Sequence, residues 1–208
     1  MTSKQHWDQV YSTRSAEAVS WFQPHAEYSL RLIRAGGMGP QARVIDVGGG
    51  ASTLVDDLLA NGFAAPTVLD LSATALAAAR LRLGAAAAGV TWIEADVTTA
   101  LGTLPHHGFD VWHDRAVFHF LTGAAERAAY VRTVLHAVKP GGLVIVATFA
   151  EDGPQQCSGL PVMRYRPNDL HAEFGTPFEL IGHEPETHHT PGGTAQQFVW
   201  CYCRKHGN

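Results

Sequence analysis

The 208-residue sequence has no long apolar run, few cysteines and no excess of basic residues. No apolar stretch approaches the roughly 18 residues that span a bilayer, and the N-terminus lacks the apolar core of an export signal. Cys157, Cys201 and Cys203 do not have the spacing of a disulfide framework. Nineteen acidic and fifteen basic residues give a net charge of −4, whereas nucleic-acid binders usually carry clustered basic residues. We therefore expect a cytoplasmic protein with reduced thiols that binds neither membranes nor nucleic acids, and the composition favours an enzyme.

Short β-branched segments alternate with helical segments along most of the chain. The pattern predicts strands at 43–47, 66–70, 91–94, 109–113 and 143–148, and helices at 51–60, 73–83, 124–138 and 167–174. Segments 178–184 and 196–204 follow with no helix between them and predict a hairpin, so the last strand should be antiparallel. Successive βα units before a hairpin predict an α/β fold with a doubly wound, Rossmann-like sheet of seven strands.

A glycine cluster follows the first predicted strand, in the order Asp46-Val47-Gly48-Gly49-Gly50. Thr53 stands where a dinucleotide fingerprint needs its third glycine, and the Lys-Ser/Thr pair of a phosphate-binding loop is missing. A glycine turn remains, in which Gly48 and Gly50 let the backbone approach a ligand closely. Asp46 disfavours a pyrophosphate there and suits a cationic ligand.

Two further carboxylates follow the next two strands. Asp70 ends the second strand, where a carboxylate can accept hydrogen bonds from two ribose hydroxyls. Asp96 follows the third strand and could accept one from the exocyclic amine of adenine. Each of these acids alone could be a helix cap or a surface charge. Together with Asp46 they predict one ligand site at the carboxyl ends of the strands.

At this point the sequence resembles the class I S-adenosylmethionine-dependent methyltransferases. The matching segments cover about residues 40–150 and read VIDVGGGAS, VLDLS, EADV, FDVWHDRAVFHFL and VKPGGLVIVATF. The resemblance implies S-adenosyl-L-methionine as cofactor. It places Gly48 at the methionine portion of the cofactor. It also places Asp70 and Leu71 at the ribose, and Asp96 and Val97 at the adenine. It also places Arg115 near the amino-acid end.

The N-terminal segment resembles one subgroup of these enzymes, through Trp7-Asp8-x-x-Tyr11 followed by Trp21-Phe22. That subgroup includes lysine methyltransferases of elongation factor and citrate synthase and related bacterial enzymes. The resemblance implies that Trp7, Tyr11 and Trp21 close over the cofactor, although ordinary core packing would explain Trp7 equally well. We expect a single methyltransferase domain over 1–208. Its parts would be an N-terminal lid at 1–40, a cofactor-binding core at 41–150 and an acceptor-side loop, helix and hairpin at 151–208.

The acceptor pocket should form from the lid and from the loops after strands four to six. Asp114 and His119 follow strand four and are candidate catalytic residues, with His119 as a base near neutral pH or else as a packed histidine. Cys157 lies in a predicted loop and is the third candidate catalytic residue, as a contact for a soft acceptor or metalloid or else as an inert loop cysteine. His188-His189 reads as a polar hairpin turn, and no His or Cys pair has the spacing of a metal site.

Two hypotheses for the acceptor follow. The segment WHDRAVFHFL loosely resembles thiopurine methyltransferases, and the chain has no added recognition domain, so we expect a small-molecule acceptor such as a thiol or another soft nucleophile. The alternative is a protein lysine, suggested by the N-terminal subgroup. His113-Asp114-Arg115 replaces the Asn-Pro-Pro-aromatic sequence of methyltransferases that act on DNA amines, and no Pro-Cys nucleophile occurs, which disfavours nucleobases.

Overall fold

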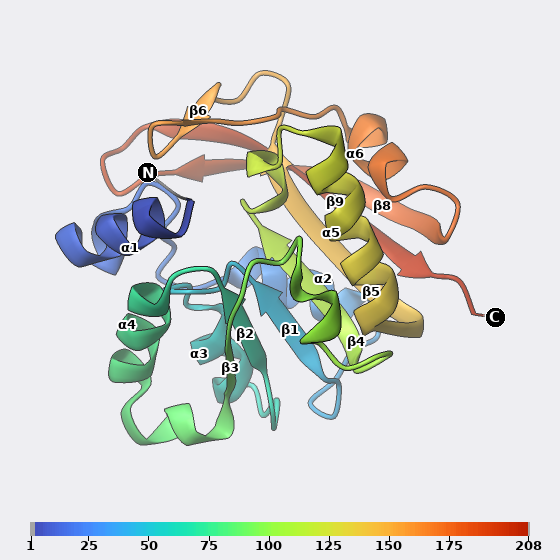
Figure 1. Cartoon of the computed structure of the whole chain (residues 1–208), viewed down its shortest axis with the longest axis horizontal. Coiled ribbons are helices and arrows are strands. Elements are labelled where there is room, and N and C mark those ends of the chain that lie inside the picture. Colours follow the sequence, from blue (N-terminus) through green and yellow to red (C-terminus); the bar gives the residue numbers. More distant parts are fainter. Residues whose placement is uncertain (1–2, 208) are drawn as a thin grey trace.

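A computed structural model describes residues 3–207, so the outermost residues of the predicted segments 1–40 and 151–208 lie outside the described residues. A seven-stranded sheet runs through the molecule (Figure 1). Its strands lie in the order β3 (Thr91–Glu94), β2 (Thr67–Asp70), β1 (Val44–Val47), β4 (Phe109–Arg115), β5 (Val138–Phe149), β9 (Ala195–Lys205) and β8 (Phe178–His189). Strands β1 to β5 are parallel to one another, whereas β9 is antiparallel to both β5 and β8. The predicted doubly wound sheet with an antiparallel last strand is confirmed.

Helices cover both faces of the sheet. One face carries α5 (Ala124–Ala137) and α6 (Pro167–Phe174), drawn in front in Figure 1. The other carries α2 (Glu27–Ala35), α3 (Leu54–Ala60) and α4 (Ala73–Leu83). Because side chains alternate along a strand, each central strand contributes to both cores, and this explains why β1 is buried along its whole length and why β5 contains an apolar run.

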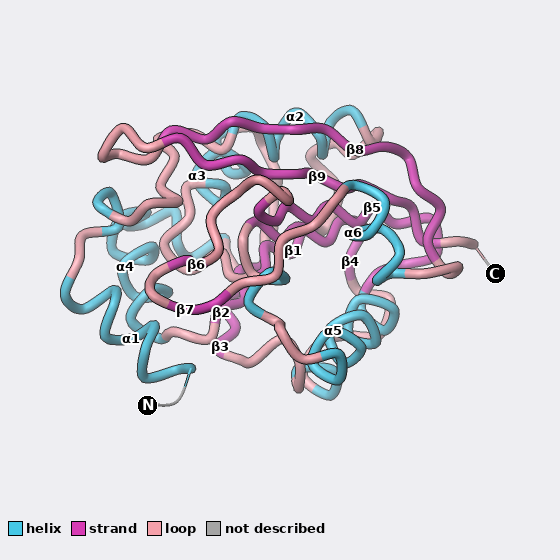
Figure 2. Tube along the Cα trace, turned by 90° about the horizontal axis from the view of Figure 1, so that it is seen from above, coloured by secondary structure: helices cyan, strands magenta, loops and turns pink. Residues whose placement is uncertain are grey.

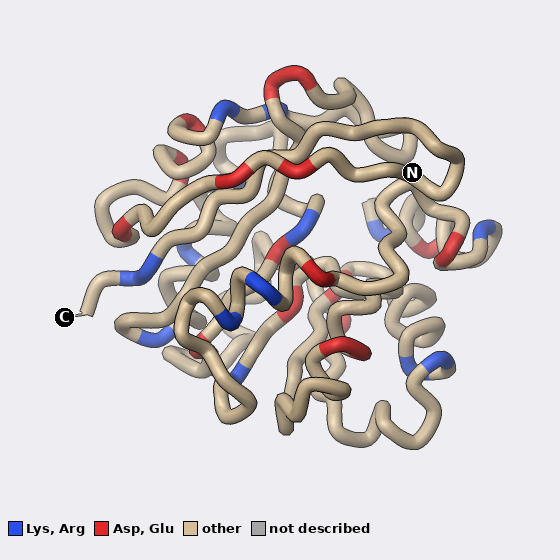
Figure 3. Tube along the Cα trace, turned by 180° about the vertical axis from the view of Figure 1, so that it is seen from behind, with Lys and Arg blue, Asp and Glu red and all other residues tan. Residues whose placement is uncertain are grey.

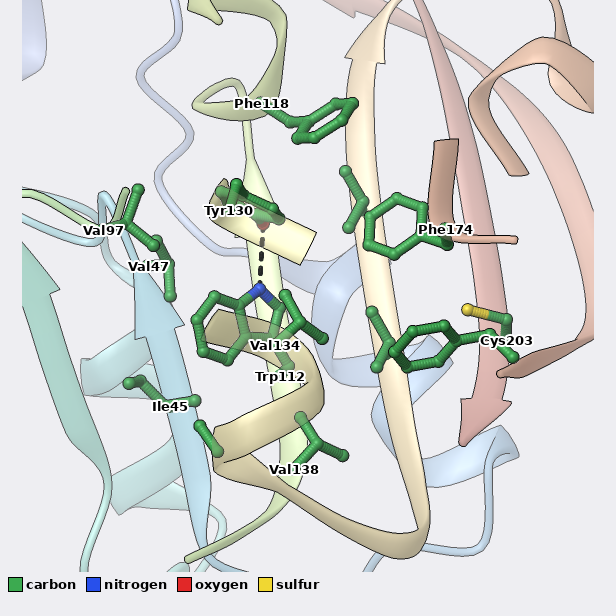
Figure 4. Close-up of a cluster of buried hydrophobic side chains, with 14 of the residues drawn as sticks. Ile45, Val47, Val97, Trp112, Phe118, Tyr130, Val134, Val138, Phe174 and Cys203 are labelled. Carbon is green, nitrogen blue, oxygen red and sulfur yellow. Dashed lines mark hydrogen bonds between the residues drawn. The ribbon is translucent and has the colours of Figure 1, made fainter. Parts of the chain in front are cut away.

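The core on the α5 side is built around two large aromatic side chains. Trp112 and Tyr130 are both fully buried, and the Trp112 indole Nε1 donates a hydrogen bond of 2.9 Å to the Tyr130 hydroxyl (Figure 4). Phe174 from α6 and Val134 from α5 pack around them. This pairing lets a tryptophan and a tyrosine be buried without leaving their polar atoms unpaired.

The N-terminal segment lies at the carboxyl end of the strands. Helix α1 (Ser3–Thr13) packs beside α4, and a short 3-10 turn η1 (Ala16–Ala18) leads on toward α2. The small hairpin of β6 (Gln156–Cys157) and β7 (Leu160–Pro161) lies above the same end of the sheet (Figure 2). The short 3-10 turns elsewhere are η2 (Gly84–Gly89), η3 (Ala100–Gly102) and η4 (Phe118–Phe120).

Several elements begin or end away from their predicted positions. Helix α3 starts at Leu54 because the glycine turn and Ser52 come first, and β4 continues through Arg115. The predicted hairpin turn at His188-His189 is wrong, because β8 extends to His189 and the turn occupies residues 190–194. His188 is buried, and its Nε2 lies 2.7 Å from the Ser20 carbonyl oxygen.

Charged residues of both signs are interspersed along the chain trace, as Figure 3 shows from behind. Within residues 3–207, no helix has the length and apolar character required to cross a membrane.

Candidate functional site

The glycine turn after β1 brings three strands together at their carboxyl ends. Gly48 has φ +67°, and a Cβ there would lie 1.9 Å from a Val117 side-chain carbon. A Cβ on Gly50 would lie 2.5 Å from the Asp70 carboxylate. Only glycine at both positions allows this close approach. The Gly50 N–H instead donates a hydrogen bond of 2.9 Å to Asp70 Oδ2.

Asp70 is a buried carboxylate that holds the turns after β1 and β2. Its Oδ1 accepts from the Ser72 N–H at 2.7 Å, and Ser72 caps α4 as its sequence position predicts. Burial raises the pKa of Asp70 to about 6, with a further increase from the charges of Asp46 and Asp8. Each carboxylate oxygen has a second acceptor site, so Asp70 can still accept from a ligand in the adjoining cavity.

The larger of two adjoining cavities opens over β1, β2 and β3. It brings together most of the predicted site residues, which are Trp7, Tyr11, Trp21, Gly48, Asp70, Leu71, Asp96, Val97, Arg115 and Cys157. Phe120, which sequence reasoning assigned no role, joins the three N-terminal aromatic residues. The Trp7 ring lies 5.1 Å from Phe120 and 5.7 Å from Trp21, both edge to face. These rings form an apolar wall opposite the acidic strand ends.

The smaller cavity lies on the other side of the glycine turn and shares Tyr11, Trp21, Gly48 and Arg115 with the larger one. Asp46 lines it, although the structure places this residue outside the larger cavity. Asp46 is 3% exposed, and its Oδ2 is buried with no hydrogen-bond partner among the described residues. An unpaired buried carboxylate oxygen is costly, so this atom marks a place for a donor.

Arg115 lies between the two cavities and is also incompletely paired. Its Nη1 donates to the Trp21 carbonyl at 3.1 Å, and its guanidinium lies 4.5 Å from the centre of the Phe198 ring. Glu186 approaches Nη2 only to 3.6 Å, and neither Nε nor Nη2 has a hydrogen-bond partner within residues 3–207. Burial lowers the pKa of Arg115, but an arginine stays charged in proteins. The guanidinium is therefore a cation with free donors beside the cavities.

Asp114 lies outside both cavities, whereas the sequence predicted it in the acceptor pocket. It belongs to β4, so its side chain points to the opposite face from that of Arg115. Its oxygens accept from the backbone of Val117 at 2.9 Å, the backbone of Phe118 at 3.1 Å and the Tyr130 hydroxyl at 2.6 Å. Burial raises the pKa of Asp114 to about 6. These contacts give Asp114 a structural task, namely to hold the turn that forms the cavity wall.

His119 also lies outside both cavities, in η4. Its side chain is fully buried between the rings of Phe120 and Phe149, at 4.5 and 4.7 Å. Burial, together with the charge of Arg115, lowers the pKa of His119 to about 3. A general base must reach the proton that it removes. This geometry favours the packed histidine that the sequence left as the alternative.

Cys157 lines the larger cavity from β6, a short strand where the sequence predicted a loop. Its side chain is 5% exposed, and burial raises the pKa of the thiol to about 12 despite the positive charge of Arg115. The thiol is therefore neutral near pH 7 and is not an activated nucleophile. No group of three or more His, Cys, Asp or Glu residues suited to a metal ion occurs within the described part of the chain.

Asp8 is a site residue that sequence reasoning missed. Its Oδ1 accepts from the Ser72 hydroxyl at 2.7 Å, and its Oδ2 pairs with Lys4 at 3.0 Å. Hydrogen bonding to Ser72 is the largest effect that lowers the pKa of Asp8 to about 2. Asp8 thus fixes α1 to the start of α4, so that Trp7 and Tyr11 face the cavity. The available signal was its place inside the Trp-Asp-x-x-Tyr motif.

Residues 45–144 match the sequence model of a family described as a methyltransferase domain. The match covers 100 of the 208 residues, so this part of the chain is similar to a methyltransferase domain. No curated protein matches the chain at a significant level.

Solved structures share its whole fold at low sequence identity. A protein studied for the conversion of a disulfide bond into a thioacetal group during echinomycin biosynthesis is 20% identical, with a TM-score of 0.80 over 100% of this chain and 94% of that one. A methyltransferase from Anabaena variabilis is 15% identical, with a TM-score of 0.73 over 99% and 96%. The 1,6-didemethyltoxoflavin N1-methyltransferase of Burkholderia thailandensis, solved with S-adenosylhomocysteine, is 18% identical, with a TM-score of 0.65 over 98% and 84%.

Proposed function

We propose that this protein is an S-adenosylmethionine-dependent methyltransferase that acts on a small-molecule acceptor, with a thiol or another soft nucleophile as the favoured class. The observation that carries the proposal is the lining of the larger cavity, where Cys157 lies with the apolar rings of Trp7, Trp21 and Phe120. An apolar wall of this kind suits a soft acceptor, whereas burial of the ammonium group of a lysine against it costs free energy.

The residues that line the cavities fit the cofactor. We assign its adenosine to the larger cavity, with Asp96 and Val97 at the adenine and Asp70 with Leu71 at the ribose. We assign its amino-acid end to the smaller cavity beside Gly48. There the unpaired Oδ2 of Asp46 would accept from the ammonium group. The unpaired nitrogens of Arg115 would donate to the carboxylate.

S-adenosylmethionine supplies a methyl group on a sulfonium that is already activated for in-line displacement. The contribution of the chain is therefore to align the partners and to exclude water. We propose that the segment up to residue 40 acts as a lid for this purpose, because Trp7 and Tyr11 from α1 and Trp21 cover one side of the larger cavity. No residue is needed as a base when the acceptor arrives as a thiolate.

The acids of the larger cavity also disfavour a lysine acceptor. Asp70 and Asp96 lie at the strand ends assigned to the ribose and adenine, and each accepts a hydrogen bond from backbone N–H. Glu126 accepts from the backbone of Gly123 at 3.0 Å. Two of the three acids that line the larger cavity are thus assigned to the cofactor, which leaves Glu126 as the one lining acid for a lysine ammonium. Among the structures that share the fold, one concerns the conversion of a disulfide bond and another the methylation of a small heterocycle.

The test is a panel of small thiols, selenols and amines, with release of S-adenosylhomocysteine as the readout. We expect turnover with at least one thiol or selenol. A parallel incubation of radiolabelled S-adenosylmethionine with a cell lysate should label no protein band. A labelled band together with an inactive small-molecule panel would contradict the proposal and favour the lysine alternative.

Arg115→Met sharpens the same test, with Arg166→Met as control. Arg166 is an exposed arginine that pairs with Glu151, and it lines neither cavity. We expect Arg115→Met to lose most of its turnover with a thiol while Arg166→Met keeps it. Equal activity of the two variants would show that turnover does not depend on Arg115.

A further inference from the structure

Three buried polar side chains form a hydrogen-bonded chain at the base of the smaller cavity. His113 Nδ1 lies 2.7 Å from Asp46 Oδ1, and His113 Nε2 lies 2.8 Å from the Ser29 hydroxyl. The exposed fractions of Ser29, His113 and Asp46 are 1%, 2% and 3%. All three residues line this cavity.

The fold brings these residues together from three separate elements. Asp46 on β1 and His113 on β4 are direct partners in the register of two adjacent parallel strands. Their side chains point to the face of the sheet that α2 covers, and Ser29 lies on the buried side of α2. An ionised Asp46 can only accept, so His113 Nδ1 must carry a proton. Nε2 can then accept from the Ser29 hydroxyl, so each of the three side chains has a partner in the chain.

The hydrogen-bonded chain of Ser29, His113 and Asp46 uses only one of the two carboxylate oxygens of Asp46. Oδ1 of Asp46 is bound by His113, whereas Oδ2 is buried and unpaired. A Cβ on Gly49 would lie 2.4 Å from Oδ2, so this oxygen lies directly below the glycine turn. A carboxylate held at one oxygen cannot rotate freely, and its other oxygen keeps a fixed direction.

We propose that His113 and Ser29 are positioning residues, which hold the Asp46 carboxylate so that Oδ2 faces the ammonium group of the cofactor. The proposal rests on the proposed location of the amino-acid end in the smaller cavity. It also gives α2 a part in cofactor binding, because Ser29 belongs to the N-terminal segment and not to the strand ends. In this proposal His113 acts through Asp46 and not as a ligand of the cofactor.

The experiment compares two ligands by titration calorimetry. S-adenosylhomocysteine carries the amino-acid end, whereas 5′-methylthioadenosine keeps the adenosine and the thioether but lacks it. In His113→Ala we expect the affinity for S-adenosylhomocysteine to fall about tenfold, the scale reported for partners that orient a binding side chain. The affinity for 5′-methylthioadenosine should change less than about twofold. A merely structural role would weaken both ligands alike.

Two milder variants keep the test decisive if His113→Ala does not fold. His113→Asn retains a donor for Asp46 Oδ1 and should recover part of the lost affinity for S-adenosylhomocysteine. Ser29→Ala should weaken that ligand alone, by a smaller factor. The matched control is Thr133→Val, which removes a fully buried hydroxyl from α5 on the opposite face and should change neither affinity.

The outcomes separate the two proposals. Equal losses for both ligands, or no loss for either in His113→Asn and Ser29→Ala, would overturn the positioning role while leaving the cofactor site intact. Failure of the unaltered protein to bind either ligand would contradict the proposed cofactor site, and the positioning role with it.

Discussion

The two halves of the carboxyl edge of the sheet differ in how their polar groups are paired. Over β1 and β2, the Asp70 carboxylate accepts two backbone N–H groups, from Gly50 and Ser72, which lie 20 and 2 residues away along the chain. Over β4, Arg115 bonds to the Trp21 carbonyl, 94 residues away, and two of its nitrogens have no hydrogen-bond partner among the described residues. The first half is assembled from local sequence, the second from distant segments. Unpaired donors remain where a ligand is expected.

The largest expected effect is at the glycine turn, in Gly49→Ala. The added Cβ would lie 2.4 Å from Asp46 Oδ2 and 2.7 Å from Asp46 Cγ, so the turn and the carboxylate must move apart. We expect the affinity for S-adenosylhomocysteine to become unmeasurable. The free energy of unfolding should fall by about 1–3 kcal/mol, as for other overpacked sites.

Gly102→Ala is the control for that substitution, because a Cβ at this position meets no atom within 4 Å. Its affinity and thermal midpoint should match those of the unaltered protein. Unchanged binding in Gly49→Ala would show that the turn is not part of the site.

The next largest effect is expected in Asp70→Ala. Loss of the carboxylate should weaken binding of S-adenosylhomocysteine by about 1.5–3 kcal/mol, the scale of hydrogen bonds to a charged group. Asp169→Ala in α6 removes an exposed acid and should leave the affinity unchanged. Calorimetry that finds equal affinities for the two variants would contradict the proposed ribose contact.

The pH dependence of binding gives a smaller effect of known sign. The pKa of Asp70 is raised to about 6, so this carboxyl group is ionised above that pH and gains a proton below it. If the ionised form binds the ribose, the affinity should fall about tenfold between pH 7 and pH 5, as one proton is taken up. Asp70→Asn should flatten this dependence. If the affinity of Asp70→Asn still falls with decreasing pH, the pH dependence comes from another group.

A smaller effect is expected in Asp8→Ala, which releases α1 from Ser72 and removes the pair with Lys4 inside the helix. We expect a loss of about 1 kcal/mol in binding of S-adenosylhomocysteine, the value typical of one hydrogen bond, because Trp7 and Tyr11 are no longer held at the cavity. Hydrogen exchange should increase in α1. If exchange increases while the affinity stays constant, α1 does not contribute to the cofactor site.

The smallest effect is expected in His119→Leu. Burial lowers the pKa of His119 to about 3, and its ring faces neither cavity, so kcat with the best thiol acceptor should change less than about twofold. A large fall in kcat with constant affinity for S-adenosylhomocysteine would restore His119 as a base.

The contrast between the two halves also explains what the sequence could predict. The doubly wound sheet and the cavity residues Asp70, Leu71, Asp96 and Val97 follow from local patterns, because the carboxyl ends of parallel strands meet at one edge. The sequence could not show that Asp114 and Arg115 have different roles. Strand β4 runs two residues further than its apolar pattern predicts, and because side chains alternate along a strand, those of Asp114 and Arg115 point to opposite faces of the sheet.

Pairs between distant segments had no pattern to reveal them. The contact of Ser29 with His113 joins residues 84 positions apart, and that of Asp8 with Ser72 joins residues 64 apart. His119 stands in an aromatic segment that suits either a catalytic loop or a packed turn, and only its burial distinguishes them.

A crystal structure with S-adenosylhomocysteine tests the central claim most directly. We expect the ribose hydroxyls on the Asp70 carboxylate, the adenine beside Asp96, and the amino-acid end between Asp46 Oδ2 and Arg115. A nucleoside bound away from the ends of β1, β2 and β3, or an amino-acid end that points toward β6 instead of the smaller cavity, would contradict the account.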